Sequence, residues 1–191
     1  MAKAKRYKAQ LPLTKDTLKY LAVTVAALIF IAYIITTTRF TLRDFGIVVG
    51  FILIGAAARF PERFMPVALG IELISVFTIV SSIRYGSLVG AIVGAAAFTL
   101  SGYFTIERPQ DVLVAALGFI GIAYFAPLSY AFFAQNLGLT AIALTVGYDV
   151  FTGFFYFFMG YGIVSVVRFS VVHIIANYLI IIYLGAKLLG I

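Results

Sequence analysis

Residues 138–160, GLTAIALTVGYDVFTGFFYFFMG, and residues 163–188, IVSVVRFSVVHIIANYLIIIYLGAKL, decide the fold of this chain. Each run is long enough to cross a bilayer as a helix, which takes about 20 apolar residues. Neither run alternates polar and apolar residues with a period of two, as the strands of a membrane barrel do. Only Tyr161 and Gly162 separate them. They therefore predict two neighbouring membrane-spanning helices joined by a short turn.

The rest of the chain repeats this pattern. Of its 191 residues, 63% are hydrophobic and 11% charged, and apolar runs alternate with short polar breaks. This composition predicts an all-α, polytopic membrane helical bundle. The second run is short for a perpendicular crossing, so six or seven transmembrane helices are expected within a single domain, 17–191. The predicted spans are 17–38, 44–59, 66–83, 86–105, 112–134, 138–160 and 163–188.

The basic residues predict the orientation. The formal net charge is +7, and six of the 14 Lys and Arg residues lie in the first 19 positions. A basic segment before an apolar helix is typical of a cytoplasmic tail that contacts anionic lipid headgroups. We therefore expect residues 1–16 to be a cytoplasmic tail, the protein to lie in the cell membrane with several passes, and nucleic acid not to be a partner.

The sequence lacks the residues that several kinds of catalytic and metal-binding site require. The chain has no cysteine and one histidine, His173. It contains no HExxH motif, no Gly-x-Ser-x-Gly motif and no glycine-rich phosphate loop. We therefore expect neither an enzyme nor a cofactor, and no metal site, because one histidine with carboxylates alone is an uncommon ligand set.

Polar side chains follow one face of each of the last two spans. Asp149 lies eleven residues before the inner end of one span and His173 ten residues after the inner start of the next, so a short hairpin brings them to the same depth. An ionisable group there is costly unless it is paired or used. The pair either binds a solute or proton, or clamps two helices. The two faces comprise Thr145, Asp149, Thr152 and Tyr156, then Ser170, His173 and Asn177.

A further carboxylate, Glu72, lies within the predicted span 66–83 with Ser75, Thr78 and Ser82 on nearly the same side. Arg168 is expected at a similar depth. It either forms a buried pair with Glu72 or extends its guanidinium to the cytoplasmic headgroups. The candidate substrate-binding residues are therefore Glu72, Asp149, Tyr156, His173 and Asn177.

Small residues mark one helix face, at Gly86, Gly90 and Gly94. Small residues four apart let a neighbouring helix approach closely. This face serves either packing within the chain or docking onto another membrane subunit, and the spacing does not distinguish the two.

From residue 63 to about 188 the order of features resembles the substrate-binding S components of energy-coupling-factor vitamin transporters and the related MreD-like membrane proteins. The resemblance rests on Pro66-Val-Ala-Leu-Gly-Ile-Glu72, on Tyr85-Gly86 with Gly90 and Gly94, on Asp149-Val-Phe-Thr-Gly153 and on His173-Ile-Ile-Ala-Asn177. It implies a six-helix bundle with a small-molecule pocket that opens outward. It also implies a transmembrane coupling subunit and two ATPases as partners. The coupling subunit would dock on a small-residue face, either the Gly86, Gly90 and Gly94 series or Gly55 and Ala56 with the residues that follow. The additional N-terminal span departs from this pattern and reverses the core if the N-terminus is cytoplasmic.

These observations predict an integral membrane subunit that binds a small solute for transport. Two alternatives stay open: a non-catalytic structural subunit of a larger membrane assembly, and a carrier that acts alone and couples solute to protons through His173 and Asp149.

Overall fold

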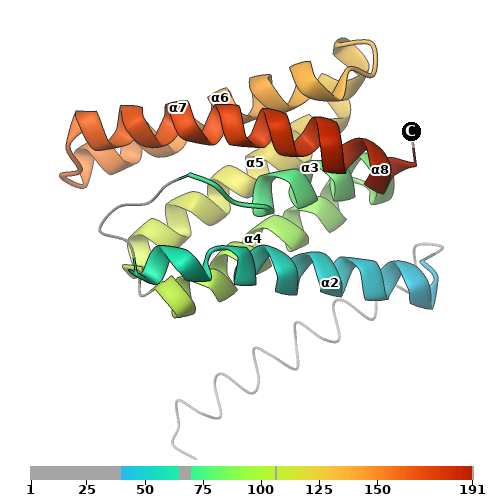
Figure 1. Cartoon of the computed structure of the whole chain (residues 1–191), viewed down its shortest axis with the longest axis horizontal. Helices are drawn as coiled ribbons and strands as arrows, with labels where there is room; N and C mark the ends of the chain where they lie inside the picture. Colours follow the sequence, from blue (N-terminus) through green and yellow to red (C-terminus); the bar gives the residue numbers. More distant parts are fainter. Residues whose placement is uncertain (1–39, 65–69, 106, 191) are drawn as a thin grey trace, which may run out of the picture. The chain divides into compact units, whose positions relative to one another are not determined.

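The computed structural model describes residues 40–64, 70–105 and 107–190 (Figure 1). The predicted cytoplasmic tail, 1–16, and the first predicted span, 17–38, lie outside the described residues. Residues 46–191 form one compact unit, which holds the candidate site. The described part of the other unit, residues 40–45, starts a helix at which Thr41 and Asp44 exchange side-chain and backbone hydrogen bonds as a capping box.

Every regular element among the described residues is helical. They are α2 (Leu42–Ala58), a 3₁₀-helix (Phe60–Phe64), α3 (Ile74–Tyr85), α4 (Ser87–Thr105), α5 (Pro109–Phe132), α6 (Leu137–Phe158), α7 (Ile163–Ile180), a π-helical stretch (Ile181–Gly185) and α8 (Ala186–Leu189).

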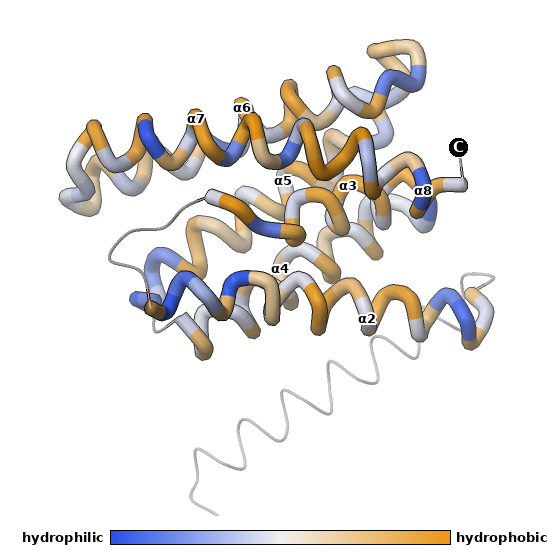
Figure 2. Tube along the Cα trace, in the orientation of Figure 1, coloured by the Kyte–Doolittle hydropathy of each residue, from blue (hydrophilic) through white to orange (hydrophobic). Residues whose placement is uncertain are grey.

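Five of these segments are long and apolar enough to span a membrane. They are Leu42–Phe64, Ser87–Thr105, Pro109–Phe132, Leu137–Phe158 and Ile163–Leu189. Hydrophobic residues dominate the long helices (Figure 2). Many large apolar side chains of α6 and α7 are exposed. In water such surfaces would be unfavourable, whereas in lipid they are the expected outer face. The all-α bundle is thus confirmed, and the chain is a multi-pass membrane protein.

The third predicted span is wrong at its start. Residues 70–73 are not helical, and α3 begins only at Ile74, which leaves a helix of 12 residues. Gly70 has a φ of +72°, outside the helical region, and the Glu72 carboxylate accepts hydrogen bonds from the backbone N–H groups of Ile74 and Ser75 at 2.6 and 3.0 Å. These bonds satisfy the free donors at a helix start. Glu72 therefore caps α3 from outside.

The glycines of α4 pack within this chain. A Cβ on Gly90 would lie 1.8 Å from the Ser82 Oγ, and one on Gly94 would lie 2.5 Å from the Thr78 Oγ1. Gly55 is also close-packed, 3.3 Å from Ile74 by the same measure, and Ala56 is fully buried. Gly55, Gly90 and Gly94 therefore bring α2, α3 and α4 together.

Gly86 does not belong to this set. A Cβ there would meet nothing within 4 Å, and its φ of +94° ends α3 just before α4 starts. This φ is one that residues with a Cβ rarely adopt. Gly86 is therefore a turn residue and not a packing residue, which corrects its assignment to the helix face.

Candidate functional site

Three ionisable side chains meet inside the bundle, and His173 lies at their centre. Its Nδ1 is 2.7 Å from the Asp149 Oδ1, and its Nε2 is 3.3 Å from the Glu72 Oε1 and 3.4 Å from the Ser75 Oγ. The Ser75 hydroxyl in turn donates to the Glu72 carboxylate. The predicted meeting of Asp149 and His173 is confirmed. Donation from both ring nitrogens requires the imidazolium form.

Two close approaches hold this group, which we call the His173 cluster (Glu72, Ser75, Asp149 and His173). A Cβ on Gly153 would lie 2.9 Å from Val166, so α6 and α7 approach closely just beside their turn. A Cβ on Gly70 would lie 3.0 Å from the backbone oxygen of Phe169 and 3.1 Å from the backbone nitrogen of His173. Gly70 therefore lets residues 70–73 lie directly against α7, which brings Glu72 to His173.

A second charged group lies around Arg59 at the end of α2. Its Nη2 contacts Glu62 at 2.7 Å and also Glu107, and its Nη1 donates to the Ser101 Oγ at 2.9 Å. The guanidinium carbon lies 4.3 Å from the centre of the Phe98 ring. Arg59 is 5% exposed, so this is a buried ion-pair network linking α2, α4 and residue 107. We call it the Arg59 network.

A third group lies at the start of α5, beside the turn between α6 and α7. Asp111 accepts from Arg108 at 2.9 Å and from the Tyr161 hydroxyl at 2.8 Å. Burial, followed by the hydrogen bond to Asp111, raises the pKa of Tyr161, so this phenol keeps its proton as a donor. The Tyr156 hydroxyl donates to the backbone oxygen of Asp111 at 3.3 Å, which fixes Tyr156 beside it.

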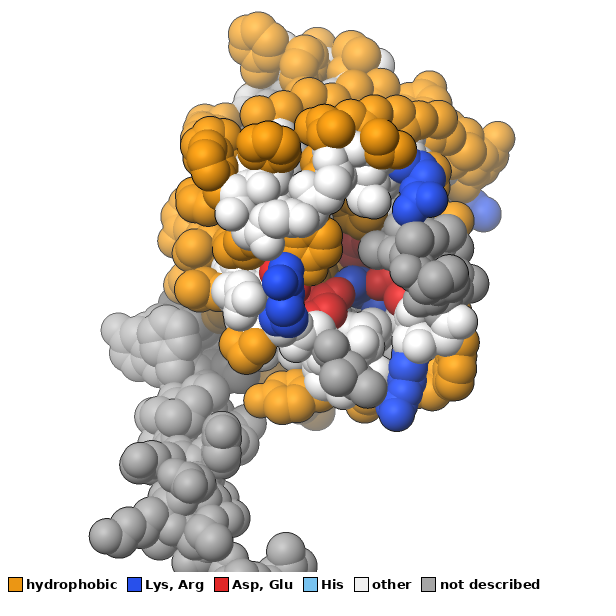
Figure 3. All heavy atoms as spheres, turned by 90° about the vertical axis from the view of Figure 1, so that its left-hand side faces the viewer, with side chains coloured by type: hydrophobic (Ala, Val, Ile, Leu, Met, Phe, Trp, Pro, Cys, Tyr) orange, Lys and Arg blue, Asp and Glu red, His pale blue; other side chains and the backbone are white. Residues whose placement is uncertain are grey.

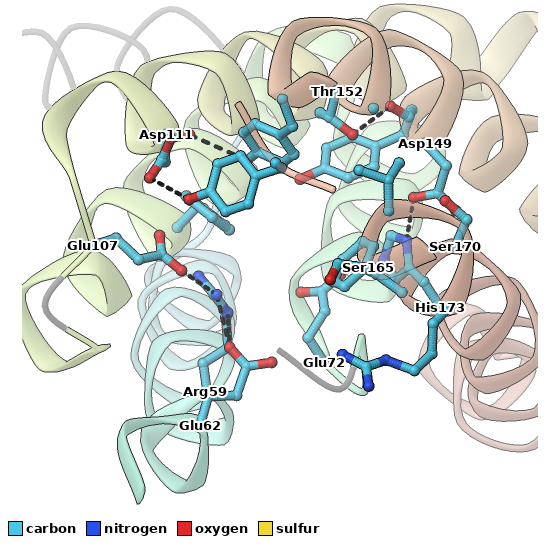
Figure 4. Close-up of a pocket in the computed structure, with 18 of the residues that line it drawn as sticks. Arg59, Glu62, Glu72, Glu107, Asp111, Asp149, Thr152, Ser165, Ser170 and His173 are labelled. Atoms are coloured by element: carbon cyan, nitrogen blue, oxygen red, sulfur yellow. Dashed lines mark hydrogen bonds and ion pairs between the residues drawn. The ribbon is translucent and has the colours of Figure 1, made fainter. Parts of the chain in front are cut away.

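These three groups surround one cavity of about 410 Å³. The Arg59 network and Asp111 lie on one side of it, and Asp149, Ser170, His173 and Glu72 lie on the other (Figure 4). At the end of the molecule that holds the turn between α6 and α7, acidic side chains lie in a hollow, and basic side chains lie within it and around its rim (Figure 3). The volume of the cavity is in the range of small-molecule sites, which starts at about 300 Å³.

Four of the five predicted substrate-binding residues line this cavity, namely Glu72, Asp149, Tyr156 and His173. Arg168 also lines it, but the contacts of the Glu72 carboxylate are with His173, Ser75 and the start of α3. The pairing of Glu72 with Arg168 is therefore replaced by a pairing with His173.

Asn177 does not line the cavity, which corrects its place in the site. Its side chain is buried one turn beyond His173, and neither its Oδ1 nor its Nδ2 has a hydrogen-bond partner among the described residues. The hydroxyl of Thr145, one turn before Asp149, is also buried without a described partner. The polar faces of α6 and α7 thus continue past the cavity as unpaired groups.

Sequence reasoning missed the whole Arg59 network and Tyr148. The segments around Arg59 and Glu107 fall at polar breaks between the predicted spans, and each mixes acidic and basic residues. That complementary charge was the available signal. Tyr148 is buried, its ring centre lies 5.4 Å from that of His173, and nothing in its spacing distinguished it from lipid-facing aromatic residues.

Fold and site together define the class: a multi-pass helical membrane protein with a charged cavity within its bundle. Within the part of the chain that the structure describes, no group of three or more His, Asp or Glu side chains is placed to hold a metal ion. No protein-family model, curated protein or solved structure matches this chain.

Proposed function

We propose that this chain is a membrane subunit that binds a small solute in its cavity for transport, as an S component does. The observation that carries the proposal is the His173 cluster at the cavity wall. A protein that needed only a helix clamp would satisfy both oxygens of Asp149, but Oδ2 has no hydrogen-bond partner among the described residues. A polar group of a solute would satisfy it.

Each residue of the site has its own role in binding the solute. Asp149, His173 and Glu72 anchor polar groups of the solute, and Tyr156 forms a wall whose hydroxyl is already held by α5. Catalysis is not part of the proposal. The cell membrane, the coupling subunit and the ATPases belong to it, and co-purification in mild detergent tests for these partners.

The direct test is native mass measurement of the full chain extracted in mild detergent. We expect a small molecule bound at one copy per chain, lost in Asp149→Asn and in His173→Gln. Thr145→Val is the matched control, because it lies one turn away on α6 and does not line the cavity. A bound molecule retained equally by all three variants would remove the cavity from consideration.

A carrier that works alone with protons is the second candidate, and the two carboxylates that flank His173 favour it. Histidine is the side chain whose charge ordinarily changes between about pH 5 and 8. Solute uptake into vesicles that contain only this chain should then depend on pH in that range. Uptake that needs added ATPases, or that ignores pH, favours the subunit.

The side on which the cavity opens is a separate part of the proposal. The count of basic residues assigns this end to the cytoplasm, whereas the resemblance expects an outward pocket. Because the chain has no cysteine, single cysteines can report the side. Gly162→Cys lies at the cavity end and Gln135→Cys in the turn between α5 and α6, and both positions are exposed. Labelling of intact cells with an impermeant maleimide should modify only one of them.

A further inference from the structure

We infer that the solute carries a protonated amine on an apolar body, and that the amine binds at Asp149. This inference rests on the proposed function, because it names the chemical class of solute that the same cavity accepts.

The first observation is the charge of the wall. Five carboxylates line the cavity, against two arginines and one histidine. Arg108, which pairs with Asp111 from outside, adds a third arginine. Even with His173 charged, the carboxylates outnumber the cations. A cationic guest would balance this excess, while an anionic one would increase it. The five are Glu62, Glu72, Glu107, Asp111 and Asp149.

The second observation is independent of charge counting. The Asp149 side chain is 4% exposed and lines the cavity, and its Oδ2 is buried without a hydrogen-bond partner among the described residues. The Glu107 Oε2, on the other side of the cavity, is in the same condition. An ionised carboxylate oxygen only accepts hydrogen bonds, so what it lacks is a donor. Leaving such an atom buried and unpaired is unfavourable.

Neighbouring hydroxyls of the protein do not fill this need. The Thr152 hydroxyl, one turn from Asp149, donates to the backbone oxygen of Tyr148 at 2.9 Å. The Tyr156 and Tyr161 hydroxyls donate to Asp111. These donors are engaged, so the Asp149 Oδ2 and the Glu107 Oε2 receive no hydrogen bond from them. An ammonium group has three donors and a positive charge, and its bonds to carboxylates are stronger than neutral ones.

The third observation is the size and the aromatic wall of the cavity, which fit an organic cation better than a bare metal ion. The cavity is far larger than an ion, and aromatic rings form much of its remaining wall: Phe98, Phe119, Tyr148, Tyr156, Tyr161 and Phe169. Aromatic faces attract organic cations and bury apolar surface. The wall therefore suits an amine attached to a hydrocarbon or aromatic body.

The test compares three probes of one shape: tryptamine, which is cationic, tryptophol, which is neutral, and indole-3-propionate, which is anionic. Binding to the full chain in detergent is measured by calorimetry and by the shift of the unfolding temperature. Tryptamine should bind at least roughly tenfold more tightly than the other two. Asp149→Asn should weaken it roughly tenfold, and Thr145→Val should change it less than twofold.

Asp149→Asn keeps the shape and an acceptor for His173, and the comparison of the three probes uses the unchanged chain, so a folding defect of the variant would not decide the result. Equal or tighter binding of tryptophol or indole-3-propionate, an unchanged affinity of tryptamine in Asp149→Asn, or no binding of tryptamine overturns the inference. Stabilisation by sodium or potassium chloride alone, equal to that by tryptamine, also overturns it. If the anionic probe binds and depends on His173, the proposed function stands and only the class of solute is wrong.

Discussion

Gly70→Ala tests whether residues 70–73 pack closely against α7. Its effect on stability has two parts, the backbone strain of a positive φ and the steric clash with α7. Gly70 has a φ of +72°, where a residue with a Cβ loses about 1–2 kcal/mol. Its Cβ would also lie 3.0–3.1 Å from backbone atoms of Phe169 and His173, which belong to a helix and cannot rotate away. Overpacking of this kind costs about 1 kcal/mol or more. We expect a total loss of about 2–3 kcal/mol.

The assay is unfolding of the detergent-solubilised chain by SDS, followed by the helical circular dichroism signal. Gly160→Ala is the control: its φ is +90°, and a Cβ there meets nothing within 4 Å, so it reports strain alone. Gly70→Ala should lose at least about 1 kcal/mol more than this control, and solute binding should weaken because Glu72 moves away from His173. Equal losses in the two variants would refute the close contact.

Three further changes test the packing and the buried charges in the same assay. Gly90→Ala should lose about 1–3 kcal/mol, because its Cβ would lie 2.9 Å from a backbone oxygen of α3, whereas Gly147→Ala, with nothing within 4 Å, should gain up to about 1 kcal/mol; a similar effect of both would contradict the α3–α4 contact. Arg59→Met should lose about 3–5 kcal/mol, since it leaves two acidic partners uncompensated, and a loss below about 1 kcal/mol would mean that water solvates them. Thr145→Val should gain about 1 kcal/mol because it removes a buried hydroxyl without a described partner, and a loss would reveal that the hydroxyl is bonded.

The part of the site that sequence predicted depends on local rules. Asp149 and His173 lie in helices joined by four residues, 159–162, so counting residues from the turn was enough to place them at one depth. The same counting places Asn177 one turn deeper. Whether a cavity extends that far depends on side chains from other helices, which is why Asn177 was assigned to the site and lies outside it.

The start of α3 shows what local rules cannot give. Residues 66–71 are apolar and continue the pattern of a span, with nothing before Glu72 to stop a helix. The chain instead takes a positive φ at Gly70, where the backbone of α7 leaves no room for a side chain. That contact joins residues about 100 positions apart. Periodicity along one segment does not contain this information.

Glycine spacing was informative about packing but not about the partner. Gly86, Gly90 and Gly94 are evenly spaced, yet α4 starts only at Ser87, so the first of them lies in a turn. The other two lie against α3 and α5, with Phe119 near Gly94. An outer subunit would have to bind a different face, because this one is already covered within the chain.

The Arg59 network and the His173 cluster differ in how their charges are compensated. This difference predicts that one group serves stability and the other serves solute binding. Arg59 meets two carboxylates, a hydroxyl and an aromatic ring, so its charge is balanced within the protein. His173 meets two carboxylates as well. The Asp149 Oδ2 beside it has no described partner, and neither has the Glu107 Oε2 beside Arg59, but only Asp149 is proposed to hold the solute. Breaking the first group should therefore reduce stability whether or not a solute is present. The second group is incomplete without a donor, so Asp149→Asn should reduce the stabilisation that a solute adds, while the stability of the solute-free protein changes less than in Arg59→Met.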